Sequence, residues 1–176
     1  RMQLLVATTN EDKLREIRSL LSGVPIDLLT LRDLPPIEEP EETGITFAEN
    51  ARLKARYYAG VSGLLTVAED SGLAIDALDG EPGVRSARFL RPDASYPERF
   101  AAILARLAER SDRRRDARFI CAVAVVQGSN VLYETEGRIE GRIADTPRGR
   151  HGFGYDPIFY FPPYDATLGE VTEQKK

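Results

Sequence analysis

The sequence predicts an α/β fold in which helices cover a mixed sheet that contains at least one antiparallel pair of strands. Short apolar runs alternate along the chain with amphipathic segments that begin at capping residues, a pattern typical of strands and helices in turn. Two late apolar runs are separated only by "QGSN", which predicts a hairpin. With 176 residues and 42% hydrophobic content the chain can bury one substantial core, so we expect a single domain over residues 1–176.

The N-terminal part of the chain predicts two strands joined by a helix. Residues 3–7 form a short apolar run, and Asn10 is a suitable N-cap for a helix that continues to about Leu21 with acids in its first turn. A second strand is expected at 26–31. The Pro- and Glu-rich stretch after it, "LPPIEEPEETG", predicts a loop.

Two capping boxes of the form Ser/Thr-x-x-Glu predict the remaining helices. "TFAE" at 46–49 begins a helix that we expect to reach about Ala59. "SYPE" at 95–98 begins another that we expect to reach about Arg110. Each helix therefore has a defined start, set by residues only three positions apart.

The C-terminal part predicts a hairpin followed by irregular chain. Residues 119–126 and 131–138 flank the short turn and are expected to pair antiparallel. The "RRR" at 113–115 before them fits a solvated connection better than a nucleic-acid patch. After Thr146 the segments rich in glycine, proline and aromatic residues, including "FYFPPYD", predict loop.

Composition excludes several classes of function. The formal net charge of −4 provides no basic field for nucleic acid, and the longest apolar run has eight residues where a membrane span needs roughly 20. The single cysteine, Cys121, rules out an internal disulfide and fits a reducing, cytoplasmic location. Of 24 basic residues only Lys13, Lys54, Lys175 and Lys176 are lysine, a compact charge that suits a crowded phosphate site.

A glycine-free turn between the first strand and helix is the first candidate site. Hydroxyl and amide donors at Thr8, Thr9 and Asn10, with the charge of Lys13, would suit a phosphate at a helix N-terminus. Alternatively, Asn10 only caps the helix and Lys13 is only solvated. Asn50 and Lys54 lie four residues apart and so share one helix face.

An acidic cluster is the second candidate site. An apolar strand at 64–68 is expected to stop at "EDSG", which places Glu69 and Asp70 at its end. Two adjacent carboxylates in that position favour a divalent cation between them, and without histidine or thiolate they favour Mg²⁺ or Mn²⁺ over zinc. "EETG" at 41–44 offers a third carboxylate. The alternative is an ordinary Asp-Ser-Gly turn beside an exposed acid.

"GFGYDP" at 152–157 is the third candidate site. The flanking glycines leave room for a ligand to lie flat on Phe153, and Tyr155 and Asp156 offer polar edges, a composition that suits a nucleobase. Packing of these aromatic side chains into the core is the competing interpretation. His151, the only histidine, has no serine or cysteine nucleophile beside it in sequence, so we do not expect it to be catalytic.

Taken in order, these segments resemble the inosine triphosphate pyrophosphatase family, which hydrolyses noncanonical purine nucleoside triphosphates. The matching motifs are "ATTNEDKLREI", "EETGITFAENARLKA", "EDSGLAIDALDGEPGVRSARF" and "GFGYDPIF", and they span essentially the whole chain. The resemblance implies a mixed α/β sheet in two lobes with a nucleotide cleft between them. It also implies a homodimer that releases pyrophosphate from ITP, dITP and XTP.

The resemblance also implies roles for individual residues. Asp70 would be the proton acceptor, with Lys13 and Lys54 acting on the phosphates. Mg²⁺, or Mn²⁺ in its place, would be held by Glu42, Glu69 and Asp70. Glu42 and Asp70 match the family's metal carboxylates, and Glu69 is adjacent in the same acidic pair. The implied substrate contacts are Thr8, Thr9, Asn10, Lys13, Asn50, Lys54, Ser71, Phe153, Gly154, Tyr155, Asp156 and Lys176.

The end of the given sequence departs from the family pattern. In the family a Ser-His-Arg segment that recognises the purine 6-keto oxygen follows the lysine, whereas this sequence ends in "TEQKK". We therefore expect the natural protein to continue past Lys176. Two other functions stay open: a related pyrophosphatase for ordinary or pyrimidine nucleotides, and a noncatalytic nucleotide sensor. The paired acids argue against the sensor, because a protein that only binds a triphosphate gains nothing from carboxylates unless they hold a metal.

Overall fold

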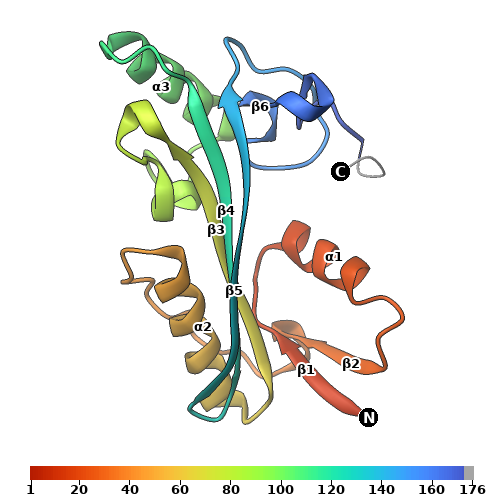
Figure 1. Cartoon of the computed structure of the whole chain (residues 1–176). Helices are drawn as coiled ribbons and strands as arrows, with labels where there is room; N and C mark the ends of the chain where they lie inside the picture. Colours follow the sequence, from red (N-terminus) through yellow and green to blue (C-terminus); the bar gives the residue numbers. More distant parts are fainter. Residues whose placement is uncertain (173–176) are drawn as a thin grey trace. The chain divides into compact units, whose positions relative to one another are not determined.

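The structure is a computed structural model that describes residues 1–172, so Lys176 lies outside the described residues (Figure 1). The strands are β1 (Met2–Val6), β2 (Ile26–Thr30), β3 (Thr66–Ile75), β4 (Asp116–Gln127), β5 (Asn130–Ile143), β6 (Phe159–Phe161) and β7 (Ala166–Thr167). The α-helices are α1 (Glu11–Leu20), α2 (Phe47–Ser62) and α3 (Tyr96–Glu109). Short 3-10 helices are η1 (Leu31–Asp33), η2 (Asp76–Leu78), η3 (Gly83–Arg88), η4 (Asp156–Ile158) and η5 (Pro162–Tyr164).

These strands form one mixed sheet in the described part of the chain, which confirms the predicted fold class. Its order is β2-β1-β3-β4-β5-β6-β7. The chain divides into two compact units: unit 1 comprises Arg1–Asp70 and Cys121–Gly137, and unit 2 comprises Ser71–Ile120 and the chain from Arg138 onward. Strands β3, β4 and β5 each contribute residues to both units.

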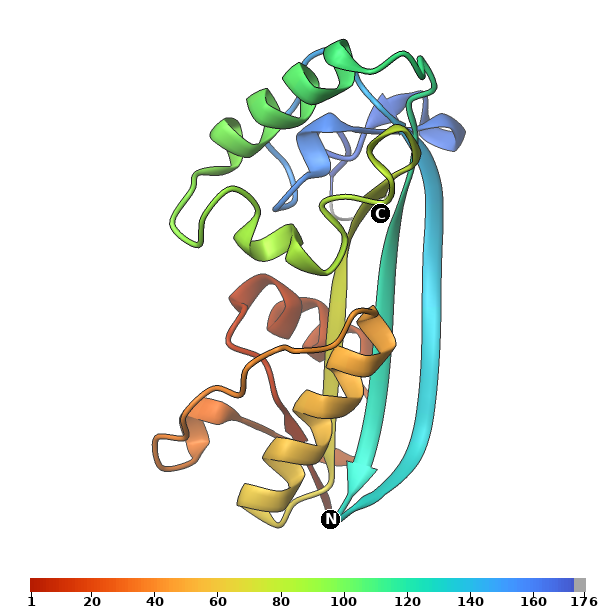
Figure 2. The same cartoon turned by 90° about the vertical axis from the view of Figure 1, so that its left-hand side faces the viewer.

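Unit 1 contains three parallel strands in addition to its parts of β4 and β5. β1 pairs in parallel with β2 on one side and with β3 on the other, where Val6 lies opposite Val67. The crossovers containing α1 and α2 lead to opposite sides of β1, and right-handed crossovers of that kind place their helices on opposite faces of the sheet. Figure 1 shows α1 and α2 on opposite sides of the strands, and α2 runs alongside β3 (Figure 2).

The helix starts follow the predicted caps, with one difference. The Asn10 side chain accepts hydrogen bonds from the first-turn amides of α1, and Ser95 forms the complete predicted capping box of α3. At α2, Thr46 accepts from the amide of Glu49, but the Glu49 carboxylate accepts from the amide of Ile45 at 2.8 Å. The second half of this box is therefore shifted by one residue.

Two predicted boundaries in the sheet are wrong. β3 does not stop before "EDSG" but continues to Ile75, because Leu73 and Ile75 are fully buried apolar residues that extend the strand beyond the acids. "FYFPPYD" is not entirely loop, because β6 pairs with β5 and β7 pairs with β6, each over two residues. The predicted hairpin is present, and both of its strands are longer than expected.

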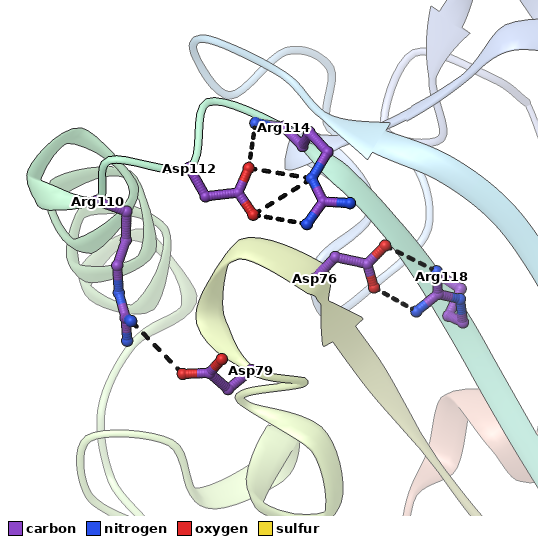
Figure 3. A network of polar contacts seen from close by, with 6 residues as sticks. All are labelled: Asp76, Asp79, Arg110, Asp112, Arg114 and Arg118. Carbon is purple, nitrogen blue, oxygen red and sulfur yellow. Dashed lines mark hydrogen bonds and ion pairs between the residues drawn. The ribbon is translucent and has the colours of Figure 1, made fainter.

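Unit 2 has its own core and its own polar network. Side chains from β3, α3 and the β6 region, among them Leu73, Ile103 and Phe159, are completely buried together. At the surface, Arg118 pairs with Asp76 at 2.7 Å and with Glu140 at 3.0 Å (Figure 3 shows the Asp76 pair). This pairing raises the pKa of the Arg118 guanidinium and ties β4 to η2. Within residues 1–172 no helix combines the length and the apolar character that a membrane span requires.

Candidate active site

The acidic residues of β3 and the polar turn after β1 meet for a topological reason. β1 ends opposite residue 67 of β3, so Glu69 and Asp70 extend just beyond its carboxyl end, where the turn begins. The crossover through α1 connects β1 to β2 and the crossover through α2 connects β2 to β3, and the two lie on opposite faces of the sheet. In open α/β sheets ligands bind at such a point, beyond the carboxyl ends of the strands. The sequence-predicted phosphate and acidic residues of unit 1 are thereby brought together.

The turn itself is partly occupied by its own hydrogen bonds. Asn10 Oδ1 accepts from the amides of Asp12 at 3.0 Å and Lys13 at 3.1 Å, so these amides are not available to a phosphate in this structure. Thr8 Oγ1 accepts from the Asn10 amide at 3.1 Å, which leaves its hydroxyl hydrogen available. Phosphate donors from this turn are therefore the hydroxyls of Thr8 and Thr9 and the Lys13 ammonium, with few backbone groups.

Lys13 extends from α1 to the acid of β3 that faces it. Its Nζ lies 2.6 Å from Oε1 of Glu69, and both side chains are largely buried. Burial lowers the pKa of the Lys13 ammonium, but the Glu69 carboxylate outweighs this and the net pKa is raised. Lys13 therefore carries its charge at every physiological pH. The Sγ of Cys121 lies 3.6 Å from the other oxygen of Glu69.

Lys54 extends from α2 to a different pair of acids. Its Nζ lies 3.0 Å from Oε1 of Glu42 and 3.7 Å from Oδ1 of Asp70. Burial, assisted by the nearby Glu42 charge, raises the pKa of Asp70 to about 6, although Lys54 and a hydrogen bond from Asn50 oppose the rise. A base with a pKa near neutrality suits proton transfer at physiological pH.

Asp70 also has an unsatisfied oxygen. Its Oδ2 is buried and has no hydrogen-bond partner, an arrangement that costs roughly 1–3 kcal/mol or more for a charged group. Buried acceptors of this kind are rare in native proteins, and a ligand is one explanation for them. An oxygen atom that lacks a partner beside a second carboxylate fits a hard divalent cation.

The loop that contains Glu42 is held against α2 by Asn50. The Asn50 side chain, which is completely buried, accepts from the Gly44 amide at 2.8 Å and donates to the Gly44 carbonyl at 3.4 Å. A Cβ at Gly44 would lie 2.6 Å from Asn50 Oδ1, so only glycine permits this approach. Asn50 thus has a structural role in addition to any contact with substrate.

The predicted set of three metal ligands is not assembled as one cluster. Within the described residues, no three His, Cys, Asp or Glu side chains come together as a group that could hold a metal ion. Glu69 and Asp70 are neighbours on one strand, and successive side chains of a strand point to opposite faces. Asp70 and Glu42 share Lys54, whereas Glu69 pairs with Lys13.

In unit 2, the predicted base segment borders a cavity of about 540 Å³. Phe153 and Gly154 line it together with Tyr96, Phe100 and His151. The cavity wall is thus formed mainly by aromatic and apolar groups, which suits a flat, weakly polar ligand.

Two other members of that segment are structural. The Tyr155 ring is buried, and its hydroxyl donates to the Ser86 carbonyl at 2.6 Å, so the polar edge expected of it is not available. Asp156 Oδ2 accepts from the Phe153 amide at 3.1 Å and so shapes the loop. Ser71, the remaining predicted contact, is half-buried on β3.

The Ham1 family model matches residues 4–176. The chain belongs to the Ham1 family. A dITP/XTP pyrophosphatase of Geobacter sulfurreducens is 44% identical over 174 residues, covering 99% of this chain and 87% of that protein. One from Gloeobacter violaceus is 49% identical over 168 residues, covering 96% of this chain and 82% of that protein.

Solved structures of Ham1 proteins have the same fold. A HAM1 protein from Coxiella burnetii matches with a TM-score of 0.91 at 40% identity, covering 99% of this chain and 89% of that one. A nucleoside-triphosphatase, dITP/XTP pyrophosphatase, from Mycobacterium abscessus matches with a TM-score of 0.82 at 42% identity, covering 98% of this chain and 91% of that one. The family resemblance expected from the motifs is confirmed.

Two contacts of this Ham1 family protein were not predicted from its sequence. Cys121 lies in an apolar run of the sequence, yet its thiol contacts the carboxylate of Glu69. The alternation in β4 was the available signal, because Ala122, Ala124 and Val126 are buried on one face and Cys121 occupies the other. No sequence pattern indicated the bond between Ser86 and Tyr155, which are 69 residues apart.

Proposed function

We propose that this Ham1 family protein hydrolyses noncanonical purine nucleoside triphosphates, namely ITP, dITP and XTP, to the nucleoside monophosphate and pyrophosphate. The observation that carries the proposal is the group Glu42, Lys54 and Asp70, in which a buried carboxylate of raised pKa keeps one oxygen without a partner. Relatives 44% and 49% identical to this chain bear the name dITP/XTP pyrophosphatase and support the substrate class.

In this proposal Asp70 and Glu42 hold a divalent cation, Mg²⁺ with Mn²⁺ as a substitute. The cation supplies charge neutralisation and orients the attacking water when it is bound. Asp70 accepts the proton of that water as the general base. Lys54 and Lys13 neutralise charge that develops on the departing pyrophosphate, as expected for phosphoryl transfer, which depends on positioning and charge stabilisation.

The remaining predicted contacts have supporting roles in the proposal. The hydroxyls of Thr8 and Thr9 donate to phosphate oxygens, and Asn10 keeps the turn in shape. In unit 2, the Phe153 ring at the cavity wall offers a face on which a purine base can stack. Lys176 is assigned to the base by family resemblance alone.

A homodimer is part of the proposal. It rests on the family resemblance, and Leu132 and Tyr133 on β5, which are 55% and 59% exposed on opposite faces of the strand, are apolar side chains that a second copy would cover. Sedimentation of the purified protein tests it, because a species of 19.6 kDa alone contradicts dimerisation. The cytoplasmic location expected from the sequence stays a prediction.

A substrate panel tests the proposed reaction. ITP, dITP, XTP, ATP and GTP are incubated with the protein and Mg²⁺, and pyrophosphate and phosphate are measured separately. We expect pyrophosphate release that EDTA abolishes, with ITP and XTP favoured over ATP by about 10²-fold or more. A site that hydrogen-bonds a polar substrate atom can reach about 10⁴–10⁵-fold discrimination. Equal turnover of ATP favours the alternative of a pyrophosphatase for ordinary nucleotides, and binding without turnover favours a sensor.

A further inference from the structure

The two acids of β3 differ in the contacts that their oxygen atoms make. Glu69 and Asp70 point to opposite faces of the strand. Figure 1 shows α1 on one side of the strands of unit 1 and α2 on the other, and each helix contributes one lysine. Lys13 of α1 pairs with Glu69, and Lys54 of α2 lies beside Asp70. The acids therefore pair with two different lysines, although the charges of Lys13 and Asp70 also interact.

Both carboxylate oxygens of Glu69 are occupied by groups of the protein. Oε1 lies 2.6 Å from the Lys13 ammonium, and Oε2 accepts from the Cys121 thiol at 3.6 Å. Burial, together with the Glu69 charge, raises the pKa of Cys121 to about 12, so the thiol keeps its proton and can donate it in a hydrogen bond. Asp70 differs from Glu69 because its Oδ2 has no hydrogen-bond partner, which leaves that oxygen available to a metal ion.

The ammonium of a lysine sits on a flexible four-carbon stem, whose ordering costs about 2 kcal/mol of conformational entropy. A buried carboxylate 2.6 Å away restricts the ammonium before any ligand arrives, with the Glu69 side chain only 9% exposed. Preorganisation of this kind reduces the entropy that a substrate must overcome on binding. Lys13 begins only three residues after the cap of α1, so the restricted ammonium stays at the phosphate turn.

We propose that Glu69 is a positioning residue that holds Lys13 at the phosphate turn, oriented in turn by Cys121, and that it is not a metal ligand. This inference rests on the proposed function and deepens it, since it divides the acidic pair of β3 into one metal-binding and one lysine-positioning carboxylate. It replaces the assignment of Glu69 to the metal that the sequence suggested.

A double-mutant cycle with ITP as substrate tests the positioning role. Glu69→Gln, Lys13→Ala and the double variant are compared with the wild type in kcat and KM. We expect Glu69→Gln to raise KM for ITP and to lower kcat/KM about tenfold, with less than about a twofold further loss when it is added to Lys13→Ala, because residues that act through one another are not additive. If Glu69 acted only through its charge, Glu69→Gln would lower KM instead, because removing a negative charge favours binding of the polyanionic triphosphate.

Metal binding is measured separately, by titrating the nucleotide-free protein with Mn²⁺ and following the free ion by electron paramagnetic resonance. We expect Glu69→Gln to bind Mn²⁺ within about twofold of the wild type, and Asp70→Asn to bind it at least about tenfold more weakly. Asp27→Asn, which removes a carboxylate from a surface pair with Arg1 in the same unit, is the matched control and should leave both measurements unchanged.

Two cysteine variants keep the proposal testable if Glu69→Gln folds poorly. Cys121→Ser retains a donor and should keep wild-type KM, whereas Cys121→Ala should raise KM about threefold. The inference would be overturned if Glu69→Gln bound Mn²⁺ more weakly than the wild type or had a lower KM for ITP. It would also be overturned if the losses in kcat/KM from Glu69→Gln and Lys13→Ala multiplied in the double variant. If the wild type releases no pyrophosphate from any triphosphate of the panel, the proposed function fails instead, and the Mn²⁺ titration still reports whether Glu69 is a ligand.

Discussion

Asp70→Asn should strongly reduce turnover and at the same time make the metal-free protein more stable at neutral pH. The substitution keeps the shape of the side chain but removes the charge that makes it a base and a metal ligand. We expect kcat to fall by at least ~10²-fold, the low end of what a positioned acid–base group contributes. The gain in stability arises because the ionised carboxylate is only 5% exposed and one of its oxygens has no partner.

The magnitude follows from the pKa of Asp70. A rise from 3.8 in the unfolded chain to about 6 in the folded protein corresponds to about 3 kcal/mol, because each pKa difference of one is worth 1.36 kcal/mol. Since the folded pKa is raised, the favourable contribution of the protonated acid is complete below about pH 4. It is lost as pH rises through about 6. Lys54 retains Glu42 at 3.0 Å in the variant, so no second charge is stranded.

Thermal unfolding in EDTA at pH 4.5 and pH 8 measures the effect. At pH 8 the variant should melt roughly 6–12 °C above the wild type, given about 2–4 °C per kcal/mol for a chain of this size. At pH 4.5, where the folded wild type is mostly protonated, the difference should fall to about a third of that. Adding Mg²⁺ at pH 8 should stabilise the wild type and not the variant. An unchanged or lower melting temperature of Asp70→Asn at pH 8 would refute the reasoning, as would a gain that is independent of pH.

Three further outcomes are expected. Lys13→Ala and Lys54→Ala should each reduce kcat/KM for ITP by an amount worth ~1–3 kcal/mol, the range for a charge-assisted hydrogen bond, and a loss below twofold in steady-state assays would contradict their assignment. Gly44→Ala would place a Cβ 2.6 Å from the Asn50 side chain. The variant should therefore have a lower melting temperature and need more Mg²⁺ for half-maximal activity. If both values are unchanged, the proposed role of this contact is contradicted. Arg118→Ala removes the ion pairs to two partly exposed carboxylates of unit 2. It should lower the free energy of unfolding in urea by about 1 kcal/mol and leave kcat unchanged. A large loss of kcat would contradict a purely structural role.

Short-range features of this protein could be predicted from its sequence. The caps at Asn10 and Ser95 depend on hydrogen bonds that span at most three residues, and the hairpin between β4 and β5 depends on a two-residue turn. The motifs for phosphate and for acidic ligands were also local, which is why the family could be identified from them. Such features are determined by neighbours along the chain, and a sequence displays those neighbours directly.

The tertiary structure decided what those residues contact. Whether β3 stops at its acids depends on the core that receives Leu73 and Ile75, and that core is formed by segments distant in sequence. The continued strand sends Glu69 and Asp70 to opposite faces, so two adjacent carboxylates that looked like one metal site face two different lysines. A sequence shows that two acids are neighbours; only the folded strand determines that their side chains diverge.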